Sequence, residues 1–226
     1  MKHVLHNPVY NALLSGDQRL GLGNANVKFF DEAVSPFAGF DENYTNGFSD
    51  LHTLFPAGRK ILYARPSRIP KPDGWQLNHE IEGLQFVYEG TKEIEGSFSN
   101  VQPLGKEHVA EMIALATLTK PGPFAARTIE FGYYHGIFEN EKLVAMTGQR
   151  LHVQNYTELS AVCTHPDHTG KSYAHTLMQH QLALILQQGQ QPFLHVRADN
   201  ARAIALYERL GFTVSRQMNF YFMKRL

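Results

Sequence analysis

Cysteine is almost absent from this 226-residue sequence, in which Cys163 is the single example. One cysteine excludes an internal disulfide and a cysteine-rich zinc site. An excess of charge is also missing, because 21 Lys and Arg residues balance 21 Asp and Glu residues. Coating a nucleic acid or attaching to an anionic membrane surface requires a basic excess, so we expect neither kind of partner.

Long apolar runs are missing as well. No stretch approaches the roughly 20 apolar residues of a transmembrane helix. The N-terminal segment MKHVLHNPVYNALLSGD has no apolar core of the kind found in signal peptides. We therefore expect a cytoplasmic protein, and 226 residues suit one large domain or two small ones.

The most informative stretch is ELSAVCTHPDHTGKSYA, residues 158–174. An apolar run at 159–164 predicts a strand, Pro166 and Asp167 predict a turn, and small residues at 169–172 precede a helix. The helix has one apolar face, formed by Ala174, Leu177, Met178, Leu182 and Ile185. A helix start presents unpaired N–H groups and the positive end of the helix dipole, so we expect a phosphate or pyrophosphate to bind there.

Two other interpretations of this stretch are open. A nucleoside-triphosphate loop would need a glycine five residues before Gly170, where the chain has His165. An ordinary strand-to-helix connection would need Gly170 only to turn the chain. The stretch alone does not distinguish an anion site from the ordinary connection.

Residues 1–100 show no phosphate-binding turn and no paired catalytic set. Their pattern predicts short helices at 7–14 and 45–54 and strands at 60–64 and 84–88, among turn-rich segments. We interpret this half as a structural or lid-forming domain. The polar, broken segment 90–103 predicts a boundary near residue 100, which gives two domains, 1–100 and 101–226.

The second half alternates helices and strands. Apolar periodicity predicts a helix at 106–119, the helix whose apolar face runs from Ala174 to Ile185, and strands at 132–139, 143–153, 159–164 and 193–198. Asn200 begins a further helix, Gly211 ends it, and a last strand covers 212–224. The sequence therefore predicts a mixed α/β fold in which helices flank a central mixed sheet.

Two motifs carry a resemblance to a known family. The segment NARAIALYERLGF, residues 200–212, matches Asn-x-x-Ala-x-x-Leu-Tyr-x-x-x-Gly-Phe, and the strand-turn-helix at 162–174 precedes it at the right separation. In both, residues 101–226 resemble the GNAT superfamily of acetyl-CoA-dependent N-acetyltransferases. The first half looks like the divergent extra domain of some two-domain members, and a degenerate copy of the same fold is one interpretation of it.

The resemblance implies a site for acetyl-CoA. Main-chain groups of the strand at 162–164 would pair with the pantetheine arm, the loop at 169–174 would hold the pyrophosphate, and Asn200 would lie near the thiol. The implied cofactor-binding residues are Val162, Cys163, Thr164, Thr169, Gly170, Lys171, Ser172, Tyr173, Ala174 and Asn200. The three fixed positions of the family pattern Gln/Arg-x-x-Gly-x-Gly/Ala are occupied here by Thr169, Ser172 and Ala174. Threonine therefore replaces Gln or Arg, and serine replaces the first glycine.

The resemblance also implies two catalytic residues. Tyr207 would protonate the departing thiolate, and Glu158 would be the general base that accepts the proton of the amine. Each implied role has a simpler alternative: a core aromatic for Tyr207, a surface carboxylate for Glu158, a helix cap for Asn200 and a solvated charge for Lys171. Cys163 is more typical of a small core residue than of a nucleophile.

The implied function is transfer of an acetyl group from acetyl-CoA to a primary amine of a small-molecule or peptide acceptor by direct attack. A catalytically inactive CoA-binding regulatory module is the alternative, and a purely structural domain is a third. Arg127, Tyr133, Tyr134 and Arg150 precede the central strand, where the family builds its acceptor pocket. An arginine among aromatics suits an acceptor that bears a carboxylate.

Overall fold

The computed structural model describes residues 3–91, 94 and 97–226. A large sheet contains β4 (Lys60–Arg65), β5 (Trp75–Tyr88), β6 (Gln102–Pro103), β7 (His135–Glu139), β8 (Lys142–Val153), β9 (Tyr156–Thr164), β10 (Gln191–Arg197) and β11 (Phe212–Arg225). A small antiparallel sheet contains β1 (Gly21–Gly23), β2 (Val27–Phe30) and β3 (Ala38–Phe40). The helices are α1 (Pro8–Leu13), α2 (Gly47–Leu54), α3 (Val109–Thr119), α4 (Tyr173–Gln187) and α5 (Ala201–Arg209).

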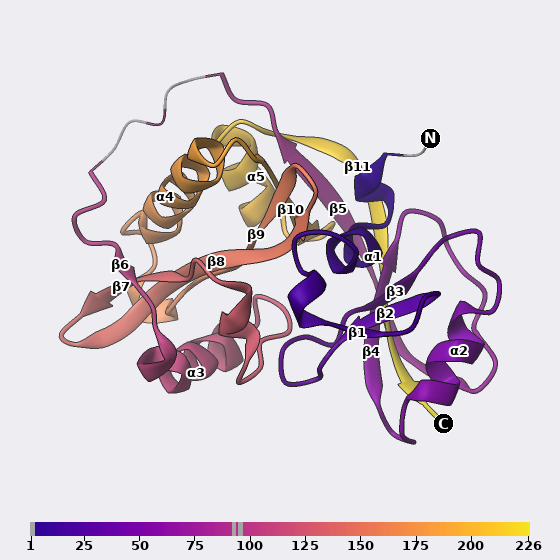
Figure 1. Ribbon diagram of the computed structural model, residues 1–226. Coiled ribbons are helices and arrows are strands. Elements are labelled where there is room, and N and C mark those ends of the chain that lie inside the picture. The colour runs from indigo at the N-terminus through magenta and orange to yellow at the C-terminus, as the bar shows by residue number, and fades with distance from the viewer. Residues whose placement is uncertain (1–2, 92–93, 95–96) are drawn as a thin grey trace.

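The large sheet is mixed, with strand order β4-β11-β5-β10-β9-β8-β7-β6 (Figure 1). All neighbours in it are antiparallel except β9 and β10, which run parallel. Helices flank this sheet, so the predicted α/β fold with a central mixed sheet is confirmed. In the described residues, no helix combines the length and apolar character needed to cross a membrane.

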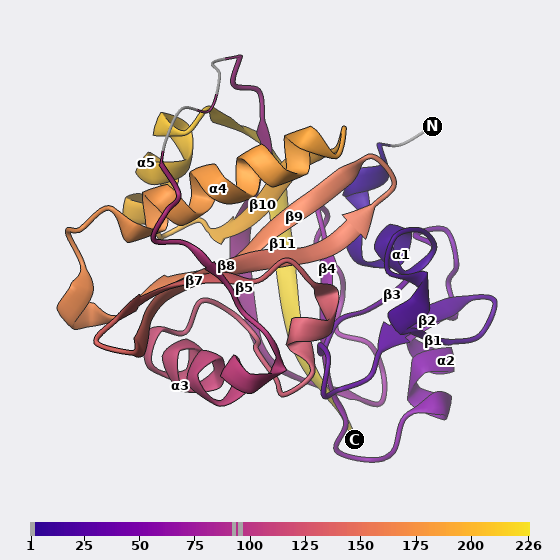
Figure 2. The same ribbon diagram turned by 60° about the vertical axis from the view of Figure 1, so that its left-hand side comes forward.

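The two faces of the large sheet carry different helices (Figure 2). On one face, Met178 of α4 and Tyr207 of α5 pack against Phe86 and Leu194 of the sheet. On the other face, α1 and α3 belong to a second cluster together with Phe193. Because successive side chains of a strand point to opposite faces, Phe193 and Leu194 mark these two sides.

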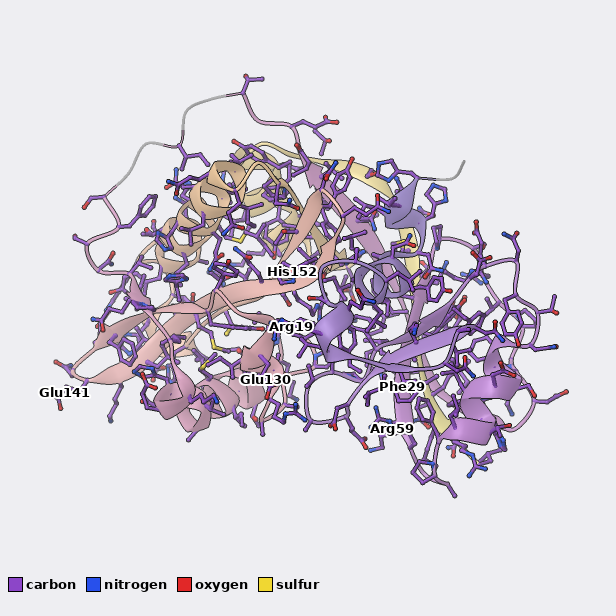
Figure 3. The ribbon with its side chains drawn as sticks, viewed as in Figure 1. Arg19, Phe29, Arg59, Glu130, Glu141 and His152 are labelled. Carbon is purple, nitrogen blue, oxygen red and sulfur yellow. The ribbon has the colours of Figure 1, made fainter. Side chains whose placement is uncertain are left out.

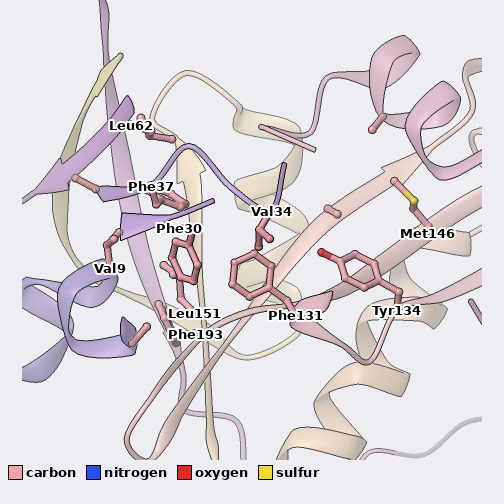
Figure 4. Close-up of a cluster of buried hydrophobic side chains, with 14 of the residues drawn as sticks. Val9, Phe30, Val34, Phe37, Leu62, Phe131, Tyr134, Met146, Leu151 and Phe193 are labelled. Carbon is pink, nitrogen blue, oxygen red and sulfur yellow. The ribbon is translucent and has the colours of Figure 1, made fainter. Parts of the chain in front are cut away.

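Residues from both halves of the chain share one core (Figure 4). Phe30, Phe37 and Leu62 lie in the same buried cluster as Phe131 and Phe193. The boundary predicted near residue 100 falls between β5 and β6, and part of that segment, 92–93 and 95–96, lies outside the described residues. The division into two domains stays a prediction, whereas the sheet and the core run across it.

The N-terminal segment is also attached to β8 through polar contacts. Asp17 is buried and accepts hydrogen bonds from the main-chain N–H of His152 at 2.9 Å and from its ring Nδ1 at 2.7 Å. Arg19 donates to the main-chain carbonyl of Glu130; Figure 3 labels these side chains. The Asp17 contacts hold the N-terminal segment against β8, which borders the site described below, and the Arg19 contact joins it to residues 128–131.

The sequence missed two parts of the fold. The small sheet was interpreted as turns, because its strands of three or four residues are too short to show a period. β5 starts at Trp75, nine residues before the predicted strand at 84–88, and its exposed first part pairs along β11. Long-range pairing therefore extends a segment that has little apolar character of its own.

Candidate active site

A fork between β9 and β10 forms the centre of the site. The two strands pair at only three positions, and the pairing ends where Phe193 lies opposite Glu158. β9 also departs from regular pairing with β8, and Ala161 adopts a positive φ of 54° at that irregularity. The main chain of residues 159–164 therefore has no strand partner on the β10 side.

A cavity of about 740 Å³ lies at this fork. Both strands beyond the fork line it, together with the start of α4, one side of α5 and the segment 119–123 that follows α3. Its volume falls within the roughly 300–1,000 Å³ of typical small-molecule sites. Phe37, Leu62 and Ile81, from the first half of the chain, also line it.

The start of α4 offers a run of free N–H groups. Gly170 and Ser172 have positive φ angles of 82° and 60°, and the helix begins at Tyr173. The main-chain N–H groups of residues 170–175 donate to no acceptor within the described part of the chain. Unpaired amides at the positive end of a helix dipole form a site for an anion such as a pyrophosphate.

Two side chains of this loop are already engaged. The Thr169 hydroxyl donates to the carbonyl of Pro166 at 3.1 Å. The Lys171 Nζ donates to both carboxylate oxygens of Glu139, at 2.8 and 2.9 Å, and does not line the cavity. The hydrogen bonds from Lys171 and then Tyr173 lower the pKa of Glu139 to about 2. Any anion binding here therefore relies mainly on the main chain.

Tyr207 and Asn200 reach the cavity from α5. Tyr207 is 8% exposed, and its hydroxyl has no hydrogen-bond partner among the described residues. Burial raises the pKa of Tyr207 to about 12, so the phenol is protonated at neutral pH. The Asn200 Oδ1 accepts a hydrogen bond from the Ala203 N–H at 3.1 Å and so caps α5. Asn200 therefore has the helix-cap role given above as its simpler alternative, and it also lines the cavity.

Glu158 lies beneath the cavity rather than in its wall. It is fully buried, and Arg150 donates from Nε to Oε2 at 3.0 Å and from Nη2 to Oε1 at 2.8 Å. The His195 Nδ1 contacts Oε1 at 2.8 Å. Burial alone would raise the pKa of Glu158, but the charges and hydrogen bonds of Arg150 and His195 outweigh it and lower this pKa to about 2. A carboxylate so fully engaged is a weak proton acceptor, which favours a positioning role over the predicted base role.

Cys163 is buried in β9 beside the cavity, and burial raises the pKa of its thiol to about 11. A protonated thiol is a poor nucleophile. Among the predicted cofactor-binding residues, the cavity brings together Val162, Cys163, Thr164, Thr169, Gly170, Ser172, Tyr173, Ala174 and Asn200. The described residues contain no group of three or more His, Cys, Asp or Glu side chains placed to hold a metal ion.

Sequence reasoning missed His195 and the three residues from the first half. The alternating pattern at 193–198 predicted a strand, but its register against β5 and β9 places His195 beside Gln85 and Glu158. The His195 Nε2 lies 3.0 Å from the Gln85 Nε2, which also donates to the carbonyl of Leu5. No local motif signals these long-range neighbours.

Comparison with known proteins adds a family to this geometry. The FR47-like protein family matches residues 134–221. A crystal structure of a protein from Novosphingobium aromaticivorans, assigned to the GNAT family of acetyltransferases, is 31% identical, covers 100% of both chains and has a TM-score of 0.93. No curated protein sequence matches the chain.

Two more distant structures share the fold. A GCN5-related N-acetyltransferase from Kribbella flavida is 16% identical over 95% of this chain and 93% of its own, with a TM-score of 0.62. A GNAT-family acetyltransferase from Colwellia psychrerythraea is 14% identical over 90% of this chain and 84% of its own, with a TM-score of 0.54.

Proposed function

Because this chain belongs to the GNAT superfamily of acetyltransferases, we propose that it transfers an acetyl group from acetyl-CoA to a primary amine by direct attack. Acyl transfer is the chemistry of the superfamily. The observation that carries the finer proposal is a single cavity that joins the unpaired amides at the start of α4, the open edge of β9 and the hydroxyl of Tyr207.

These residues fit the parts of acetyl-CoA. The amides of residues 170–175 suit the pyrophosphate, with little help from Lys171 because Glu139 holds its charge. The free main-chain groups of β9 around Val162 and Thr164 suit the amides of the pantetheine arm, which would pair there as another strand does. The amide NH₂ of Asn200 has no hydrogen-bond partner among the described residues, and its oxygen caps α5.

Acetyl-CoA supplies a thioester, whose carbonyl carbon forms a bond to the amine nitrogen as the C–S bond breaks. Tyr207 donates its phenolic proton to the departing thiolate, and its raised pKa keeps that proton in place at neutral pH. The fork holds the thioester beside the acceptor, so much of the rate comes from positioning.

Glu158 positions its neighbours in this proposal. Both of its oxygens are engaged, and no Asp or Glu among the described residues lines the cavity. Its buried charge fixes Arg150 and His195, which both line the wall. The amine therefore reacts in its neutral form after giving its ammonium proton to water, and the proton that its nitrogen loses on forming the amide restores the phenol of Tyr207.

Calorimetry with acetyl-CoA and a thiol-release assay over a panel of primary amines test the proposal. We expect one binding site per chain and amine-dependent release of CoA. Binding without turnover on any amine would leave only the CoA-binding module, and failure to bind acetyl-CoA would remove both functions.

A further inference from the structure

Two groups of residues line the cavity from opposite faces of the sheet. The start of α4 and Tyr207 lie on the face covered by α4 and α5. Arg150 and Glu158 are cross-strand partners, and Glu158 lies opposite Phe193, which marks the other face. Cross-strand partners share a face of the sheet. In the proposed function, acetyl-CoA would therefore enter from the α4 side, and the acceptor would meet the wall that contains Arg150.

Arg150 has one nitrogen, Nη1, that makes no hydrogen bond within the described residues. Its Nε and Nη2 are held by Glu158, and its guanidinium lies 4.9 Å from the centre of the Phe37 ring. Its Nη1 has no hydrogen-bond partner among the described residues, although the side chain is only 12% exposed and lines the cavity. A buried guanidinium held on two sides is a rigid donor for a planar anion.

The charges around the cavity agree with an anionic acceptor. Its described lining residues include Lys120, Arg150, Arg197, Arg202 and Arg209 but no Asp or Glu. Asp199 neutralises Arg197 and Glu158 neutralises Arg150, which leaves Lys120, Arg202 and Arg209 as the lining cations without an ion-pair partner among the described residues. These cations would attract the carboxylate of an acceptor, and no Asp or Glu of the described lining would repel it by direct contact.

An apolar part of the cavity wall lies next to the Arg150 network and includes residues from the first half of the chain. Phe220 and Phe222 of β11 alternate to the same face, Phe222 lies opposite Leu62, and Phe220 lies opposite Ile81. The Phe220 ring lies 5.3 Å from the ring of His195, so this surface adjoins the Arg150 network. All four apolar side chains line the cavity.

We propose that the acceptor is a free apolar α-amino acid. Its carboxylate accepts from Arg150 Nη1, its side chain lies against Leu62, Ile81, Phe220 and Phe222, and its amine points to the fork. This inference rests on the proposed function and names its acceptor. A peptide N-terminus is disfavoured, because its first carboxyl group is an amide and offers Arg150 no charge.

The first test uses the unmodified protein and three matched acceptors: L-leucine, L-leucinamide and 3-methylbutylamine. A charge-assisted hydrogen bond should make kcat/KM for leucine roughly 10- to 100-fold higher than for the other two. Rates are compared at equal concentration of free amine, because the amide is the weaker base. Glycine, which lacks the apolar side chain, should react more slowly than leucine.

Two variants test the two halves of the proposal. Arg150→Lys should raise KM for leucine at least about tenfold and bring the ratio of kcat/KM for leucine to kcat/KM for leucinamide toward one. Ile81→Asn should reduce the preference for leucine over glycine. Its control is Leu77→Asn on the same strand, since Leu77 is 37% exposed and does not line the cavity.

The outcomes separate this inference from the proposed function. Equal kcat/KM for leucine and leucinamide would overturn the inference and leave the transferase intact. Binding of acetyl-CoA without any binding or acetylation of L-leucine or L-phenylalanine by the loaded protein would also overturn it. Failure to bind acetyl-CoA at all would overturn the proposed function itself.

Discussion

Tyr207 combines burial with a hydroxyl that has no partner among the described residues. We expect Tyr207→Phe to lower kcat at least about 100-fold while the acetyl-CoA Kd changes less than twofold, because the hydroxyl acts only as the bond breaks. With its pKa raised to about 12, Tyr207 stays protonated well into alkaline pH, so its ionisation should cause no loss of rate between pH 7 and 10. Steady-state kinetics and calorimetry measure both quantities.

Tyr88→Phe is the matched control for Tyr207→Phe. Tyr88 packs against Phe212 in the same aromatic cluster, is 4% exposed and does not line the cavity. Loss of its hydroxyl should leave kcat unchanged. Equal turnover in Tyr207→Phe and Tyr88→Phe would remove the general-acid role.

Glu158 should contribute to stability through its buried ion pair. Its folded-state pKa of about 2 lies below the ordinary value of 4.5. The stabilisation is therefore complete above about pH 4.5 and is lost as the pH falls toward 2. We expect Glu158→Gln to lower the free energy of unfolding at pH 7 by on the order of 3 kcal/mol, measured by urea denaturation.

Asp199→Asn is the control for Glu158→Gln. Arg197 donates from Nε and Nη2 to Asp199 at 2.9 and 2.7 Å, the same two-bond geometry, but both side chains are more than half exposed. Exposed ion pairs contribute under about 1 kcal/mol. If Glu158→Gln and Asp199→Asn lower the free energy of unfolding by similar amounts, burial does not strengthen the ion pair of Glu158.

The sequence identified the residues of the site more readily than their partners. Asn200 and Tyr207 lie two helical turns apart within one local motif, so their common position on α5 was predictable. Glu158, in contrast, meets Arg150 across a strand pair and His195 across another. Strand register sets both contacts, and it depends on the whole sheet rather than on any local pattern.

At the scale of elements, the two ends of α4 allow a direct test of the anion site. Gly170 precedes the helix with φ of 82°, and Gly189 follows it with φ of 70°; an added Cβ meets no atom within 4 Å at either position. Each change to Ala should therefore lower the free energy of unfolding by about 1 kcal/mol through backbone strain alone. Only Gly170→Ala should weaken acetyl-CoA binding, by roughly tenfold, because its amide lies at the cavity.

For both glycine variants, thermal denaturation measures the loss of stability and calorimetry measures the acetyl-CoA Kd. An acetyl-CoA Kd that changes equally in Gly170→Ala and Gly189→Ala would exclude the start of α4 as the pyrophosphate site. The same geometry explains why the family pattern has glycine where this chain has Ser172. Ser172 adopts φ of 60°, a conformation that favours glycine, at the position where the family pattern has glycine.

Helices and strands with a long periodic pattern could be predicted from the sequence, whereas short ones could not. The predicted apolar face of α4 repeats over about three turns, and the structure confirms Leu177, Met178, Leu182 and Ile185 as buried, whereas Ala174 is partly exposed. β1 to β3 span only three or four residues each, and their edges are fixed by pairing with one another. Such segments carry too few residues for a period of two to be distinguished from a loop.

At the scale of the whole molecule, the first half of the chain contributes to the site as well as to the fold. β5 lies between β11 and β10 in the large sheet. Phe37, Leu62 and Ile81 reach the cavity from segments that precede residue 100. Residues 1–100, which the sequence predicted to be structural or lid-forming, therefore also provide part of the cavity wall.

This shared sheet predicts how the chain responds to division at residue 100. The strand partners of β11 are β4 and β5, which both belong to the first half, so a fragment of residues 101–226 leaves β11 unpaired. β10 also loses its antiparallel neighbour and exposes an edge, which favours aggregation. We expect the isolated fragment to lack cooperative unfolding and acetyl-CoA binding, whereas co-expression with residues 1–100 restores both. Size-exclusion chromatography, urea denaturation and calorimetry measure the outcome. A monomeric fragment that unfolds cooperatively and binds acetyl-CoA would instead establish residues 101–226 as an independent domain.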